Sequence, residues 1–335
     1  MLRILLLLLS LFSFSYSGFK LLGYWDYQTQ LADIKEMLYA QVTPDQLSEK
    51  IGNAINEDRL EDAKMYMAIG KHYQYPLHYD YYNKYIQQRD TQLRKIRKSV
   101  GSFSTGFLTG KGSDVSGISG AMASDFTVIG DVRDLYEQYQ IQEKGGEVNK
   151  LIVTLAGVGI GLTAITYGSA GTASAVKAGT SLFKLAARTG RLTKSFSKEL
   201  LRLSSKVFDW RFFKQSIRKS NNLSDLERVA RKSFHPAALK PLKRMAKNVQ
   251  SIRHNTSIAD TLYMLKYVEN TDDLRRLEKF TYKHKQLSKG LLKLVGRGAL
   301  RSVRVIRKTT KFIISFAATL ISGLFSLLFL FSRKR

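Results

Sequence analysis

The stretch LIVTLAGVGIGLTAITYGSAGTASAV, residues 151–176, contains no charged side chain and is rich in Gly, Ala, Ser and Thr. A helix of this length rises 1.5 Å per residue and is long enough to cross the ~30 Å hydrocarbon core of a bilayer. Its small residues recur at alternating steps of four and three, which places them on one helical face: Gly157, Gly161, Ala164, Gly168, Gly171 and Ala175. In water each glycine inside a helix costs up to about 1 kcal/mol relative to Ala, whereas in lipid a small-residue stripe lets a second helix approach closely. The stretch therefore predicts a Gly-rich membrane span that self-associates through this face, with a hairpin dipping part way into the bilayer as the alternative.

Two glycine patterns that resemble nucleotide-binding loops do not carry the rest of their motifs. In Gly157-Val-Gly159-Ile-Gly161 the third glycine comes one residue too early, and no acidic residue follows about 20 positions later. The segment 106–112 resembles a P-loop but is one residue short, and Gly112 stands where Ser or Thr would bind magnesium. We therefore expect no nucleotide cofactor.

Both ends of the sequence are apolar. In residues 1–23, Arg3 precedes the apolar run 4–14, and small residues flank a cleavage point before Gly18, so this segment is either a signal peptide or an uncleaved signal anchor. Residues 312–331 contain no charge and match the thickness of the hydrocarbon core, which predicts a C-terminal transmembrane helix. A buried helix of a soluble protein is rarely apolar on every face.

The charge is distributed unevenly about the Gly-rich stretch. The whole chain carries a net charge of +27, and residues 178–311 hold 33 Lys/Arg against 9 Asp/Glu, a net of +24. Because basic loops stay on the cytoplasmic side, segment 24–150 is expected outside and the basic helical region 177–311 inside. This predicts a bacterial inner-membrane protein with a periplasmic N-terminal domain. In the alternative topology the whole chain is exported and the last helix anchors it.

The basic residues are periodic in two series. Spacings of three and four place each series on one helical face, beside apolar residues, as in a basic amphipathic helix that contacts anionic lipid headgroups. The alternatives are an ordinary solvated face and nucleic-acid binding, for which no module is recognisable. The series are Lys184, Arg188, Arg191, Lys194, Lys198, Arg202 and Lys206, and then Lys293, Arg297, Arg301, Arg304, Lys308 and Lys311.

The remaining segments predict small soluble regions built from helical hairpins. Thr43-Pro44-Asp45 has the composition of a helix start, with Thr as the N-cap and Pro at the first helical position. It opens a hairpin in an exported helical domain at 24–111, which an amphipathic linker region follows at 112–150. A similar hairpin is expected at 256–285, with Thr271 capping its second helix.

No catalytic or metal-binding constellation emerges from the polar residues. His72 and His78 in the tyrosine-rich segment 72–85 lie six apart, whereas a helical metal site places its histidines three or four apart. Aromatic packing or a contact surface is the preferred interpretation there. Asp131 and Asp134 lie one helical turn apart, but a dyad for acid–base chemistry is the weaker reading. We therefore predict neither an enzyme nor a metal site.

SDFTVIGDVRDLYEQ at 124–138, followed by the apolar run and SAVKAGTSLFKLAARTGRLTK at 174–194, resembles a group of uncharacterised bacterial membrane proteins. The same order is similar to the linker that precedes toxin domains in bacterial secreted toxins. The resemblance covers roughly 112–200 and implies a bacterial envelope protein. The expected fold is mainly α, a helical membrane protein, and the expected function is that of an envelope scaffold with an unidentified protein partner. A membrane-active, toxin-like effector and a membrane-tethered nucleic-acid binder are the alternatives.

Overall fold

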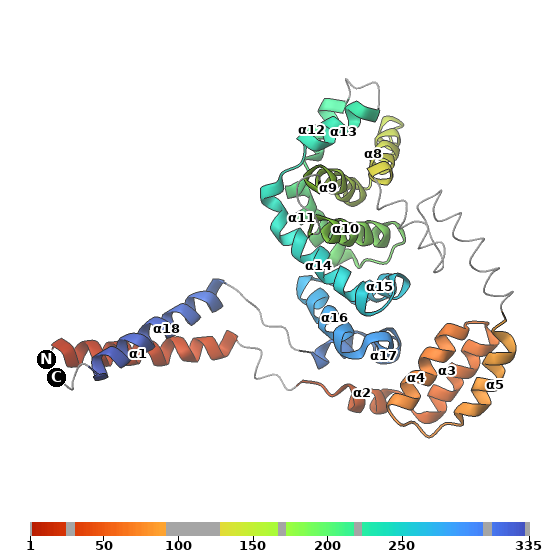
Figure 1. Cartoon of the computed structure of the whole chain (residues 1–335), viewed down its shortest axis with the longest axis horizontal. Helices are drawn as coiled ribbons and strands as arrows, with labels where there is room; N and C mark the ends of the chain where they lie inside the picture. Colours follow the sequence, from red (N-terminus) through yellow and green to blue (C-terminus); the bar gives the residue numbers. More distant parts are fainter. Residues whose placement is uncertain are drawn as a thin grey trace. The chain divides into compact units, whose positions relative to one another are not determined.

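The computed structural model describes residues 2–24, 31–91, 128–166, 172–217, 223–303 and 310–331. Within these ranges the chain is helical, apart from an isolated antiparallel bridge between Phe208 and Phe234. This confirms the mainly α prediction. The chain forms two units, one comprising residues 1–32 with 301–335 (the terminal-helix unit), the other comprising residues 33–300 (the central unit) (Figure 1).

The terminal-helix unit pairs the first and last helices of the chain, α1 (Leu2–Tyr24) and α18 (Thr310–Phe331). Thr319 Oγ1 donates to Ser17 Oγ over 3.0 Å, and Ser326 Oγ donates to Ser10 Oγ over 3.0 Å. Residue numbers fall along α1 as they rise along α18, so the two helices are antiparallel. The start of α1 and the end of α18 therefore lie at the same end of the pair (Figure 1).

The central unit begins with α2 (Ile34–Gln41), α3 (Pro44–Asn56), α4 (Leu60–His72) and α5 (Tyr79–Arg89). The predicted helix start at Thr43 is confirmed, since its hydroxyl accepts from Gln46 N and the Gln46 side chain accepts from Thr43 N, a capping box. Leu47, Ile51 and Leu60 are fully buried between α3 and α4.

A second group of helices surrounds α9. In chain order these are α8 (Val128–Glu143), α9 (Lys150–Thr166), α10 (Thr172–Arg188), α11 (Lys194–Val207), α12 (Trp210–Ile217) and α13 (Leu223–Lys232). Every side chain from 151 to 162 is buried, because α8, α10, α11 and α13 all contact α9. The expected single helix over 151–176 is thus divided into α9 and α10, which pack against each other inside the unit. The hairpin alternative describes this shape, but the hairpin is covered by the chain's own helices.

The last part of the central unit packs on both earlier parts. It comprises η1 (Pro236–Leu239), α14 (Lys240–Asn255), α15 (Ile258–Met264), η2 (Leu265–Tyr267), α16 (Thr271–His284), η3 (Lys285–Leu287), α17 (Ser288–Val295) and η4 (Gly296–Ser302). Helix α14 packs on α10 and α16, while α17 packs on α2 and α4. The two ends of the unit therefore lie together, and a Cβ built on Gly298 would lie 3.0 Å from Met37 Cε.

One detail of the predicted 256–285 hairpin is wrong. Asn270, not Thr271, caps α16, and its side chain accepts from Asp273 N. Thr271 is the first helical residue instead, and its hydroxyl donates to Glu199 Oε1 over 2.6 Å. Asn extends one atom further than the Thr hydroxyl and satisfies the same first-turn amides.

Candidate functional site

The outer surface of the α1–α18 pair is unusually apolar for a protein surface. Phe12 and Phe19 are 73% and 75% exposed, and large apolar residues are exposed along the full length of both helices. Ile4–Leu22 is long and apolar enough to be either a membrane span or a signal sequence. Ile313–Leu328 is also apolar but shorter, within the described part of α18. Apolar patches this large mark surfaces that contact lipid or a partner.

The inner seam of the same pair is polar and small, the reverse of a soluble helix pair. Besides the two interhelical hydroxyl contacts, a Cβ on Gly323 would come within 3.1 Å of the Phe14 ring, so the helices approach closely there. Small and hydroxyl-bearing residues at the interface, with apolar residues outside, are characteristic of helix packing in lipid. The seam was not predicted, although its spacing is visible in the sequence: Ser10 and Ser17 lie seven apart, and Thr319, Ser322 and Ser326 step by three and four.

The predicted small-residue face is occupied by aromatic rings of the same chain. Added Cβ atoms would lie 2.3 Å from the ring of Phe208 at Gly157 and 2.2 Å from the ring of Phe234 at Gly161. These glycines therefore accommodate phenylalanines held together by the backbone bridge, and the face is closed to a second copy of the chain. Gly168 and Gly171 fall outside the described residues, as do the side chains of Ala164 and Ala175.

Lys184 and Arg188, expected at the membrane surface, point into the central unit. Lys184 is 1% exposed, and its Nζ lies 2.6 Å from Asp131 Oδ1 and 2.8 Å from Asp134 Oδ2. Arg188 forms an ion pair with Asp134. A side chain enclosed among helices cannot reach a lipid headgroup, so the lipid-contact prediction is wrong for these two residues. The cluster fastens α8 to α10 beside the apolar α9.

Two members of the second basic series also form ion pairs within the fold. Lys293 Nζ lies 2.7 Å from Asp62 Oδ2, and Arg297 pairs with Glu269 and Asp273. Arg301 is exposed, whereas Arg304 and Lys308, and the side chain of Lys311, fall outside the described residues. In this series Lys293 and Arg297 therefore form ion pairs with carboxylates of the central unit.

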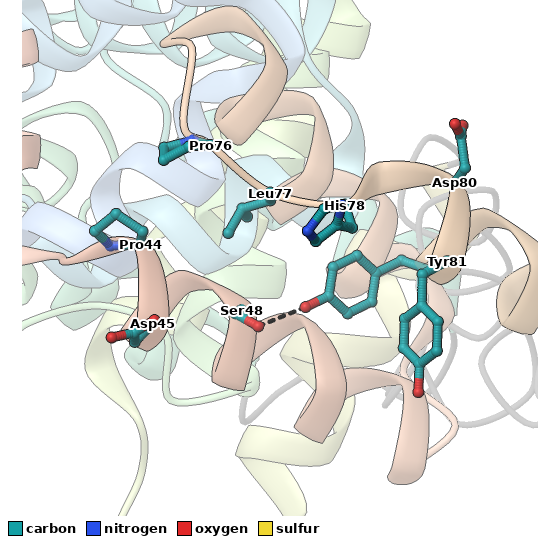
Figure 2. Close-up of a pocket in the computed structure, with 9 residues that line it drawn as sticks. Pro44, Asp45, Ser48, Pro76, Leu77, His78, Asp80 and Tyr81 are labelled. Carbon is teal, nitrogen blue, oxygen red and sulfur yellow. Dashed lines mark hydrogen bonds between the residues drawn. The ribbon is translucent and has the colours of Figure 1, made fainter.

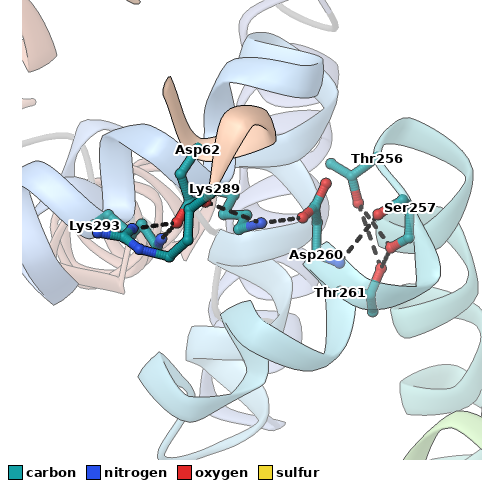
Figure 3. A network of polar contacts seen from close by, with 8 residues as sticks. Asp62, Thr256, Ser257, Asp260, Thr261, Lys289 and Lys293 are labelled. Carbon is teal, nitrogen blue, oxygen red and sulfur yellow. Dashed lines mark hydrogen bonds and ion pairs between the residues drawn. The ribbon is translucent and has the colours of Figure 1, made fainter. Parts of the chain in front are cut away.

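The pair between Lys293 and Asp62 belongs to a polar network that joins α4 to α15 and α17 (Figure 3). Lys289 contributes a 2.8 Å ion pair to Asp260 and a longer one to Asp62. Burial lowers the pKa of Lys293, although its hydrogen bond to Asp62 acts in the opposite direction. The network connects residues before α9 with residues after it, which the predicted topology places on opposite sides of a membrane. In this structure, residues on the two sides of α9 in the sequence are therefore in direct contact.

The exposed members of the first basic series lie on or just before α11. Lys194, Lys198, Arg202 and Lys206 are exposed, while Phe196, Leu200 and Val207 are buried on the opposite face. Arg191 is exposed in the turn that precedes the helix. For these residues, the structure provides the solvent-facing position that a lipid contact requires.

A groove of about 620 Å³ lies between α3 and the start of α5 (Figure 2). It is bordered by prolines and tyrosines, and Ser48 Oγ lies 2.5 Å from Tyr82 Oη at its floor. Figure 2 shows Asp80 pointing away from this hydrogen bond. Among the described residues no group of three or more His, Asp or Glu side chains is arranged to hold a metal ion. The lining residues are Pro44, Asp45, Ser48, Pro76, Leu77, His78, Asp80, Tyr81 and Tyr82.

In comparisons with known proteins, no family model, no curated protein and no solved structure matches this chain. The interpretation of the site therefore depends on its own geometry. The apolar exterior and polar seam of the α1–α18 pair are the features that restrict function most.

Proposed function

We propose that α1 and α18 form a two-helix membrane hairpin that tethers the central unit to a bilayer as a scaffold or interaction module. The observation that carries the proposal is the inverted polarity of the pair, with hydroxyls and glycine at the seam and large apolar side chains outside. In water this apolar surface would cause aggregation. In a bilayer it contacts lipid chains, which are equally apolar. On this proposal α1 is retained, since cleavage before Gly18 would remove the partners of Thr319 and Ser326.

The antiparallel hairpin also supports a one-sided arrangement. In an antiparallel pair the C-terminal end of α1 and the N-terminal end of α18 lie at the same end, so the hairpin predicts that the chain between them stays on one side of the membrane. Basic residues flank both ends, namely Arg304, Arg307 and Lys308 at one end and Arg3 and the tail 333–335 at the other. We assign the central unit to the cytoplasmic side, because it carries most of the positive charge and basic segments resist translocation.

A scaffolding role fits the remaining features of the central unit. The tyrosine- and proline-bordered groove is a concave surface suited to a protein partner, since tyrosine is enriched at interfaces. Self-association through Gly157 and Gly161 is not part of this proposal, because Phe208 and Phe234 occupy that face.

Cysteine cross-linking in native membranes tests the hairpin. The chain contains no cysteine, so paired substitutions report without background. We expect Ser10→Cys with Ser326→Cys, and Ser17→Cys with Thr319→Cys, to form intramolecular disulfides under mild oxidation, because both pairs of hydroxyls lie 3.0 Å apart. The protein should remain in the membrane pellet after alkaline carbonate extraction.

The matched control places cysteines at similar depths on the outward faces, through Phe12→Cys with Leu324→Cys. Both side chains are exposed and point away from the seam, so this pair should stay reduced. Equal cross-linking of the inward and outward pairs would contradict the hairpin. Extraction of the intact protein by carbonate, or a mature chain beginning near Gly18, would do the same.

A further inference from the structure

The exposed face of α11 is a concentrated positive surface. Lys194, Lys198, Arg202 and Lys206 occur at four-residue intervals, so their side chains cover one face of the helix, opposite its buried residues. The single acidic residue of α11, Glu199, is engaged elsewhere, since its carboxylate accepts from the backbone and hydroxyl of Thr271. Among the described residues no ion pair connects these four cations to a carboxylate.

This distinguishes α11 from α10 and α17. Lys184 on α10 and Lys293 on α17 are compensated by aspartates within the fold. Charge that is neutralised inside a protein has little attraction left for a partner, whereas uncompensated surface charge attracts polyanions. The basic face of α11 is therefore suited to an anionic partner.

The next helix in the chain begins with an exposed basic residue and an exposed aromatic residue. Arg211 and Phe212 at the start of α12 are exposed, with Phe212 43% exposed, while Phe213 is buried. An exposed aromatic residue beside basic residues is typical of segments that lie at a membrane interface. A single-stranded nucleic-acid surface would instead interleave aromatic platforms among its cations, and the exposed face of α11 has none.

We propose that the exposed face of α11, together with Arg211 and Phe212, binds the phosphate-bearing headgroups of an anionic bilayer. The inference rests on the proposed membrane hairpin, which keeps the central unit beside the bilayer and raises the effective concentration of headgroups. Each basic side chain near an anionic surface strengthens such contact by about fivefold, so four of them are sufficient to dock the unit.

The test uses the full chain in lipid nanodiscs and a reporter on the basic face, near the C-terminal end of α11. Ser205 is exposed and lies three residues after Arg202 and one before Lys206. A fluorophore attached to Ser205→Cys labels this position alone, because the chain contains no native cysteine. We expect the probe to be protected from neutral acrylamide in discs containing phosphatidylglycerol, and not in discs of phosphatidylcholine alone. Substitution of Lys194, Lys198, Arg202 and Lys206 by Gln should abolish this protection.

The control variant removes the same charge elsewhere, through glutamine at Lys35, Lys50, Lys84 and Lys144, all exposed and outside α11. It should retain the protection. Equal acrylamide quenching in both lipids, or protection that survives the α11 substitutions, would overturn the inference. Protection by duplex DNA in neutral discs without any effect of anionic lipid would overturn it in favour of a nucleic acid. Failure to assemble into either kind of disc would instead refute the membrane hairpin.

Discussion

Lys184 and Lys198 belong to one regular series of basic residues, yet they lie in opposite environments. Lys184 is enclosed between two buried aspartates, whereas Lys198 faces solvent. Periodicity assigns residues to a helical face, but it does not say whether that face meets water or another helix. Asp131 and Asp134 lie one turn apart on α8, and this spacing is the feature of the sequence that could have indicated a buried cation between them.

Replacing Lys184 by Met tests this buried cluster. The variant leaves two buried carboxylates without their shared ammonium, and loss of one partner of a buried ion pair destabilises by about 3–5 kcal/mol. Arg228→Met is the control, because the Arg228 side chain that pairs with Asp225 is 68% exposed. Loss of this exposed ion pair should lower the free energy of unfolding by at most about 0.5 kcal/mol. Urea unfolding of the detergent-solubilised chain, followed by circular dichroism, measures both, and equal losses would contradict the assigned role.

His284 gives the central unit a pH dependence. Burial lowers its pKa to about 4, with nearby Lys283 and His72 adding to the effect. The unfolded chain binds a proton near pH 6.5, so between pH 6.5 and 4 it holds more protons than the folded chain. The free energy of unfolding should therefore fall as the pH drops through this window, by at most about 3 kcal/mol.

The variant His284→Phe keeps a ring against Phe280 and removes the titrating group. We expect urea unfolding curves of this variant to depend less on pH between 6.5 and 4.5 than those of the parent chain. His254→Phe is the matched control at an exposed position and should leave the slope unchanged. An unaltered slope in His284→Phe would show that other groups account for the acid sensitivity.

At the scale of elements, the sequence predicts helices well and their surroundings poorly. The capping residues at Thr43 and the apolar runs at both ends correspond to α3, α1 and α18. The charge-free run at 151–162 is buried by other helices of the chain, and its composition alone does not separate the two environments, because a core helix and a membrane helix both exclude charge. The difference lies in whether other helices cover it, and that depends on long-range contacts such as those of Phe208 and Phe234 with its glycines.

The candidate site shows the same division between local and long-range information. Apolar composition identifies α1 and α18 separately, but their pairing joins residues such as Ser10 and Ser326 that lie at opposite ends of the chain. Hydroxyls seven apart, or three and four apart, within an apolar run indicate a seam. They do not indicate which helix supplies the other half.

At the scale of the whole molecule, each of the two units brings together its first and last segments in the sequence. In the antiparallel α1–α18 pair, the C-terminal end of α1 and the N-terminal end of α18 lie at one end. Within the central unit, the first helix, α2, packs on the last α-helix, α17, so its two ends also lie together. The Asp62–Lys293 ion pair reinforces this closure across most of the sequence. On the hairpin proposal, the segment between α1 and α18 therefore stays on one side of the membrane.

This connectivity predicts a one-sided labelling pattern. Gln88→Cys lies on exposed α5, before α9, and Ser205→Cys lies on exposed α11, after it. In sealed inverted membrane vesicles, a membrane-impermeant maleimide should modify both cysteines at similar rates, because both project into the cytoplasm on our assignment. Ser332→Cys, beyond the far end of α18, should react only after the vesicles are permeabilised. Opposite labelling of residues 88 and 205 would restore the crossing at 151–176, whereas protection of both with labelling of residue 332 would keep the hairpin and reverse its orientation.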